Sequence, residues 1–191
     1  MGRWEPNTPG RLAEAALELY SERGYEQTTV AEIAKRAGLT ERTFFRHYAD
    51  KREVLFSGSG DLEKLIVRAV ADAPEGAAPI DAVALGLDAV SEFFADRRDF
   101  ARRRQAVITA NAELQERELI KLASLSAALA DTLRRRGVTE PAASLAAEAG
   151  VAVFKVGFER WIDAAENAEG RDMAQLVREA LTEFRAVAAG R

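Results

Sequence analysis

Apolar residues recur every three or four positions along most of the chain, and charged residues fill the positions between them. This spacing is typical of amphipathic α-helices, and no stretch has the alternating, β-branched pattern of a strand. We therefore expect an all-α protein of about nine helices. Glycines, prolines and capping residues place them at about residues 9–23, 29–37, 41–47, 50–72, 79–95, 96–111, 112–136, 139–165 and 172–189.

Several polar residues stand where helices are expected to begin. Thr29 and Thr40 each precede an apolar-periodic segment, where a threonine hydroxyl accepts a hydrogen bond from the first helical turn. Asp50 and Glu53 have the spacing of a capping box, in which each side chain accepts from the other residue's amide. These residues support the predicted starts of the second, third and fourth helices.

The chain is expected to form two domains. Residues 1–56 contain three short helices, and residues 57–191 contain the longer ones. Gly58 and Gly60 interrupt the predicted fourth helix next to this boundary, although each helical glycine costs about 1 kcal/mol relative to alanine. Either a frayed turn or a hinge is consistent with this interruption.

Composition excludes several classes of function. The 191 residues are 48% hydrophobic and 30% charged, which is typical of a globular protein, and they include no cysteine and one histidine. Disulfides, thiol nucleophiles and Cys- or His-rich metal sites are therefore excluded. No phosphate loop or catalytic triad is evident, so we expect no cofactor, no metal and no enzyme. Without a signal sequence or a long apolar run, we expect a cytoplasmic protein that is not bound to a membrane.

Positive charge is concentrated in one short window of an acidic protein. The net charge is −4, yet the window from Lys35 to Arg52 contains six basic residues, with only Glu41 and Asp50 opposing them. This excess of about +4 indicates either a solvated helix face or a surface that binds an anion.

The same window has the spacing of a helix-turn-helix. Two short helices are joined at Gly38, so the first residues of the second helix can enter a DNA major groove. Phe44 and Tyr48 are four residues apart and share its inward face, whereas Phe45 points elsewhere.

The stretch TTVAEIAKRAGLTERTFFRHYADKREVLF, preceded by Gly24 and Tyr25, resembles the N-terminal domain of the TetR family of bacterial transcriptional repressors. The matching residues are Thr29, Ile33, Ala34, Ala37, Gly38, Thr40, Thr43, Phe44, Phe45, Tyr48, Lys51 and Leu55. The rest of the chain matches the family in length and helical character. The resemblance implies a three-helix DNA-binding domain, a larger helical ligand-binding domain and a homodimer.

The resemblance also implies which residues contact DNA. Thr40, Glu41 and Arg42 are expected to read bases, and Thr29, Thr43, Arg46, His47 and Lys51 to contact phosphates. Phe45 stands where the family usually has tyrosine, so we expect its ring to pack on a thymine methyl group instead. Tyr48 stands where the family usually has a buried phenylalanine, so its hydroxyl needs a partner or an exposed rim.

In the larger domain, the last two predicted helices are strongly apolar, and in the resembled family they form a four-helix bundle across the dimer axis. A ligand pocket is expected among Phe93, Phe94, Phe100, Arg104, Gln105, Ile108, Asn111, Phe154, Phe158 and Trp161, with Arg102 and Arg103 as further polar candidates. The alternative is that these aromatic residues are simply core. The string RTFFR and the general build also resemble the mycofactocin-type branch, whose members bind acyl-CoA-like ligands.

The sequence therefore predicts a ligand-responsive repressor that binds a palindromic double-stranded DNA operator as a homodimer and is released by a small-molecule effector. The effector is expected to be hydrophobic or acyl-CoA-like. One alternative is a constitutive DNA-binding protein without a ligand, and another is a helical enzyme or protein-interaction scaffold.

Overall fold

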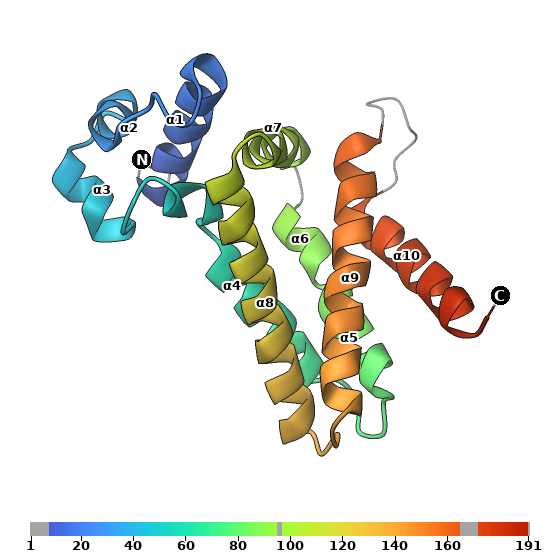
Figure 1. Ribbon diagram of the computed structural model, residues 1–191. Helices are drawn as coiled ribbons and strands as arrows, with labels where there is room; N and C mark the ends of the chain where they lie inside the picture. Colours follow the sequence, from blue (N-terminus) through green and yellow to red (C-terminus); the bar gives the residue numbers. More distant parts are fainter. Residues whose placement is uncertain (1–7, 95–96, 165–171, 191) are drawn as a thin grey trace, which may run out of the picture. The chain divides into compact units, whose positions relative to one another are not determined.

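The computed structural model describes residues 8–94, 97–164 and 172–190. Within these ranges it contains ten α-helices, one 3-10 helix and no β-strand (Figure 1). The all-α class predicted from the sequence is confirmed. None of the helices in these ranges is both long and apolar enough to cross a membrane.

The helices belong to two compact units, which we call unit 1 and unit 2. Unit 1 comprises Met1–Ser59 and Phe100–Leu119, and unit 2 comprises Gly60–Asp99 and Ile120–Arg191. The first part of unit 1 contains α1 (Thr8–Arg23), α2 (Val30–Arg36), α3 (Glu41–His47) and the 3-10 helix η1 (Glu53–Phe56). The remaining helices are α4 (Ser59–Ala71), α5 (Pro79–Asp88), α6 (Val90–Phe94), α7 (Arg98–Thr109), α8 (Ala112–Arg135), α9 (Ala142–Asp163) and α10 (Met173–Ala188).

Two of the predicted helices are divided. The predicted fourth helix consists of η1 and α4, because Gly58 between them has φ +93°, a left-handed conformation that ends a helix. Gly60 lies inside α4. The predicted fifth helix is divided at Ala89 into α5 and α6.

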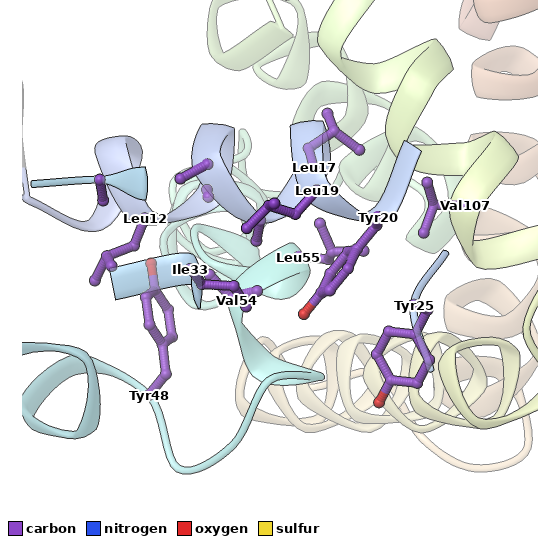
Figure 2. Packing of buried hydrophobic residues seen from close by; sticks show 14 of the residues in the cluster. Leu12, Leu17, Leu19, Tyr20, Tyr25, Ile33, Tyr48, Val54, Leu55 and Val107 are labelled. Atoms are coloured by element: carbon purple, nitrogen blue, oxygen red, sulfur yellow. The ribbon is translucent and has the colours of Figure 1, made fainter. Parts of the chain in front are cut away.

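Unit 1 has a core that joins segments distant in the sequence (Figure 2). Leu12, Ile33 and Phe44, one each from α1, α2 and α3, are fully buried there. Ile108 and Leu114, from the Phe100–Leu119 segment, are also fully buried in this cluster. The three short N-terminal helices therefore share their core with the second segment of unit 1.

Within unit 2, glycines let α9 approach its neighbours closely. An added Cβ at Gly150 would lie 2.3 Å from Val83 Cγ1 on α5, and one at Gly157 would lie 2.6 Å from Val177 Cγ2 on α10. Ion pairs on the surface accompany the α9–α10 contact, for example Arg160 with Glu183 at 2.6 Å. Small residues on α9 thus lie at the helix contacts of unit 2.

We predict that Gly157→Ala destabilises the protein. The new Cβ would also lie 2.9 Å from the backbone Cα of Val177, which cannot move as a flexible side chain can. The expected loss is about 1–3 kcal/mol in the free energy of unfolding, measured by denaturant titration. Gly60→Ala is the matched control, because Gly60 is helical with nothing within 4 Å of its added Cβ. It should stabilise by up to about 1 kcal/mol, and equal effects of the two variants would contradict the packing argument.

Candidate nucleic-acid interface

The turn between α2 and α3 is a Schellman motif at Gly38. Its φ is +67°, its amide donates to Lys35 O at 3.0 Å, and the Leu39 amide donates to Ala34 O at 2.8 Å. Arg11 on α1 also donates from its guanidinium to the carbonyl of Ala37. The sequence predicted this glycine turn, but it did not reveal Arg11 as a support of the turn.

The start of α3 is capped as predicted. Thr40 has extended backbone angles, and its hydroxyl oxygen accepts from the Thr43 amide at 3.2 Å. The Thr40 and Thr43 hydroxyls are 3.0 Å apart and share a hydrogen bond. Thr40 is exposed, so its hydroxyl can be approached from solvent.

The inward face of α3 is aromatic. Phe44 is fully buried, and Tyr48 is 8% exposed with its ring centroid 5.5 Å from that of Phe44. The Tyr48 hydroxyl finds its partner in Pro9 O, to which it donates at 3.2 Å. Burial raises the pKa of Tyr48, so the phenol stays protonated at neutral pH. The inward orientation expected for Phe44 and Tyr48 is confirmed.

The opposite face of α3 is exposed and chemically mixed. It presents Glu41, Arg42, Phe45, Arg46 and His47 to solvent. Phe45 is 55% exposed, and its ring packs edge-on against the Phe44 ring, with the ring centroids 5.5 Å apart and an angle of 81° between the ring planes. Neither Arg42 nor Arg46 has an ion pair with any residue that the structure describes, so both guanidinium groups can meet a negatively charged partner.

Other basic residues of the window are engaged within the protein. Arg36 forms ion pairs with Glu18 and Glu22 at 2.9 and 2.8 Å. Arg52 pairs with Asp50 at 2.6 Å, which lowers the pKa of that carboxyl group. Asp50 also accepts from the Glu53 amide at 3.2 Å, at the start of η1, whose N-cap position is Arg52. The positive charge available on the surface is therefore smaller than the sequence count suggests, and it is concentrated on α3.

Lys51 is the predicted phosphate contact whose geometry argues against that role. Its Nζ donates to three backbone carbonyls, those of Tyr25 at 2.9 Å, Thr28 at 3.2 Å and Glu26 at 3.4 Å. An ammonium group has three N–H donors, and all three are used here. The phosphate role of Lys51 stays a prediction that this arrangement does not favour.

The cap of α2 is a complete capping box. The Thr29 hydroxyl accepts from the Glu32 amide at 3.3 Å, and a Glu32 carboxylate oxygen accepts from the Thr29 amide at 2.9 Å. These bonds to Thr29 lower the pKa of Glu32. Because the Thr29 hydroxyl also donates to Glu32, it must reorient to donate to a phosphate. The three-residue spacing of Thr29 and Glu32 in the sequence is that of a capping box.

The predicted ligand-lining residues fall into both units. In unit 2, Phe93, Phe94, Phe154, Phe158 and Trp161 come together as one cluster, which we call the aromatic cluster. The Phe94 ring lies 5.6 Å from Trp161 and 5.5 Å from Phe158, and Phe158 lies 6.0 Å from Phe154. Phe154 and Trp161 are buried, whereas the other three rings are partly exposed.

The remaining candidates, Phe100, Arg104, Gln105, Ile108 and Asn111, lie in unit 1. Ile108 is fully buried in its core, and Phe100 packs against that core. Arg104 donates to Leu55 O at 2.7 Å, stacks on the Phe56 ring and pairs with Glu118, while burial lowers its pKa. Gln105 also donates to Glu118, and Asn111, which lies between α7 and α8, donates to Val107 O on α7. The structure gives these side chains packing partners, which the sequence could not.

Comparison with known proteins identifies both halves of the chain. A family model described as "Bacterial regulatory proteins, tetR family" matches residues 12–57, and one described as "MftR C-terminal domain" matches residues 77–189. The regulator TcmR of Streptomyces glaucescens is 35% identical over 99 residues, which are 46% of this chain and 44% of TcmR. The putative mycofactocin biosynthesis regulator MftR of Mycobacterium tuberculosis is 28% identical over 137 residues, which are 71% of this chain and 69% of MftR.

Solved structures share the fold along nearly the whole chain. PfmR from Thermus thermophilus, a TetR family regulator, has a TM-score of 0.51 and 25% identity over 91% of this chain and 96% of PfmR. A putative TetR-family regulator from Syntrophomonas wolfei has a TM-score of 0.61 and 16% identity, and the match covers 96% of this chain and 95% of the chain of that regulator. The second family model alone matches more than half of the chain. The chain therefore belongs to the TetR family of bacterial transcriptional regulators.

Proposed function

We propose that this TetR-family regulator is a repressor that binds a palindromic DNA operator as a homodimer and leaves it when a small-molecule effector binds. The observation that carries this proposal is the exposed face of α3. A short helix, buried on its aromatic side, presents two arginines without ion pairs among the described residues together with a glutamate and an exposed ring. These are side chains that read base edges and neutralise phosphates in a major groove.

The proposal divides the contacts by chemistry. Thr40, Glu41 and Arg42 at the start of α3 read bases, because arginine can bond guanine bidentately and glutamate can accept from cytosine N4. Thr29, Thr43, Arg46 and His47 contact phosphates, which position the protein without reading sequence. In this proposal residues 1–56 bind DNA and residues 57–191 bind the effector and form the dimer.

DNA binding should depend steeply on salt, and Arg46 should contribute to that dependence. An operator is first obtained by selecting bound genomic fragments, and its affinity is then measured at several salt concentrations. Arg46→Ala should reduce the slope of log K against log salt by about 0.9 for each phosphate that the arginine neutralises. Arg42→Ala should instead cost about 1–3 kcal/mol and relax the preference at one base pair.

Arg36→Ala is the matched control, because Arg36 is an arginine of the same window whose guanidinium already pairs with Glu18 and Glu22. It should leave the salt slope unchanged. If the wild-type protein binds no duplex even at low salt, the repressor proposal fails and the enzyme or scaffold alternative gains support.

Phe45 gives a second, chemically narrower prediction. Its ring is exposed, carries no hydrogen-bonding group and is held edge-on by buried Phe44, so it suits the apolar C5-methyl group of thymine. Replacing thymine by uracil at one operator position removes only that methyl, worth about 0.8 kcal/mol or about fourfold in affinity per half-site. The wild type should show this loss at one position, and Phe45→Ala should not. If the wild type and Phe45→Ala lost the same affinity on this replacement, Phe45 would not contact the thymine methyl group.

The dimer in this proposal forms through α9 and α10. Leu145, Ala149, Ala152 and Val156 follow one another at helical spacing along α9, and Leu145 and Val156 are 66% and 40% exposed. Val187 on α10 is 74% exposed. Large apolar side chains on neighbouring helices are typical of a surface that another chain covers. Two symmetric copies would read half-sites about 34 Å apart, or a multiple of that distance.

The effector in this proposal binds at the aromatic cluster. Rings from α6 and α9 converge there, and three of the five are partly exposed, so an apolar ligand can add to an existing cluster. A hydrophobic or acyl-CoA-like molecule fits this chemistry. Arg103, one of the further polar candidates for the ligand pocket, pairs with Glu14 at 2.7 Å, so this part of the proposal rests on the aromatic cluster.

A long-chain acyl-CoA should therefore raise the unfolding temperature and weaken operator binding. At a concentration 100 times the dissociation constant, the stabilisation would be about 2.7 kcal/mol. Free CoA and the free fatty acid are the controls that separate the two halves of the ligand. Phe158→Ser should reduce the shift without changing operator affinity in the absence of ligand. If neither acyl-CoA nor other apolar ligands shift the unfolding temperature or operator affinity, the constitutive alternative is favoured.

A further inference from the structure

The side chain of Lys51 donates hydrogen bonds to the backbone of the turn between α1 and α2. The carbonyls of Tyr25, Glu26 and Thr28 converge on its Nζ at 2.9, 3.4 and 3.2 Å. The ammonium group also lies 4.2 Å from the centroid of the Tyr25 ring. The turn follows the C-terminal end of α1, where carbonyls without helical partners favour a cation. The charge of Lys51 is therefore used within unit 1.

The backbone of Lys51 is also bonded within unit 1. The buried hydroxyl of Tyr20 on α1 donates to Lys51 O at 2.7 Å. Tyr20 in turn packs edge-on against Tyr25, with ring centroids 5.2 Å apart. Figure 2 shows these two tyrosines side by side, below α1. Lys51 thus joins α1, the following turn and the segment after α3 at one point.

This junction lies close to the end of α3. The helix ends at His47, and Tyr48 immediately after it donates to Pro9 O at the start of α1. Lys51 follows three residues later. A helix of seven residues has little stability of its own, so tertiary contacts decide its direction. The segment that leaves α3 is consequently tied to α1 at Tyr48 and again at Lys51.

We propose that Lys51 is a positioning residue for DNA recognition, which holds α3 in the direction needed to read bases and does not itself contact a phosphate. The inference rests on the proposed DNA-binding function. If Nζ left these carbonyls for a phosphate, the Tyr25 carbonyl would keep its bond from the Thr28 amide at 3.2 Å, but the Thr28 carbonyl would lose the partner that Lys51 provides. Thr28 in that turn is 1% exposed.

The two roles make opposite predictions for DNA binding. A phosphate contact raises the affinity for all DNA sequences alike and adds to the slope of log K against log salt. A positioning residue raises the affinity for the operator and leaves that slope unchanged. Lys51→Met, which keeps the stem and removes the charge, should lower the unfolding temperature by a few degrees. It should weaken operator binding about tenfold or more, weaken binding to random duplex much less, and leave the salt slope at the wild-type value.

Lys51→Arg separates the roles further. A planar guanidinium serves a phosphate well but cannot follow three converging carbonyls as a compact ammonium does. Arginine should therefore fail to restore the ratio of operator to random-duplex affinity. Tyr20→Phe is a milder variant that keeps every charge and removes only the bond to Lys51 O. It should lower the same ratio by a smaller factor, also with an unchanged slope.

Lys35→Met and Arg46→Met are the controls. Lys35 is an exposed lysine on α2, so its loss should leave the unfolding temperature unchanged. Arg46→Met should reduce the salt slope. A slope that falls by the amount expected for one phosphate in Lys51→Met and returns in Lys51→Arg would overturn the proposal. So would a lower unfolding temperature with an unchanged affinity ratio. If the wild type binds no DNA, the proposed function fails, whereas the unfolding temperatures still test the junction.

Discussion

The position of α3 and of its exposed side chains depends on the burial of Phe44. This side chain is the only part of α3 that is completely removed from solvent, and it lies in a core built from α1, α2, η1 and residues 100–119. Burying a phenylalanine contributes about 1.5–3 kcal/mol, which is large compared with the intrinsic stability of seven helical residues. The exposed side chains of α3 have defined positions because this one ring has a defined position. Phe45 benefits directly, since the Phe44 ring meets it edge-on at 5.5 Å.

The acidic net charge of the protein says little about this surface. Of the basic residues between Lys35 and Arg52, the structure assigns Arg36 and Arg52 to ion pairs and Lys51 to carbonyls. Exposed ion pairs of this kind contribute little to stability. In the proposed DNA-binding role their effect would be larger, because a charge that already has a partner gains less from a phosphate. The positive charge that remains available is concentrated at Arg42 and Arg46, because the other basic residues named here already have partners within the protein.

Sequence reasoning succeeded where the determining interaction is local. Thr40 and Gly38 act on amides and carbonyls within a few residues, so their spacing alone indicates the cap and the turn. It did not indicate the partners of Lys51 and Arg104, whose acceptors are backbone carbonyls 26 and 49 residues away. Any residue type supplies such a carbonyl, so no sequence pattern marks it. The same limit applies to the predicted ligand-lining residues, of which Phe93 and Phe94 belong to unit 2 and Ile108 to unit 1.

The division into units also bears on how an effector could act. Residues Phe100–Leu119 belong with the DNA-binding helices, where Ile108 and Leu114 complete the core and Arg104 contacts Leu55 and Phe56. The unit boundaries consequently fall within α7 and α8 as well as at Ser59. The chain passes between the units at three places, of which only the first lies beside the glycines at 58 and 60. A model of regulation that relies on those glycines alone would leave out two continuous helices, which resist bending more than a glycine-containing turn does.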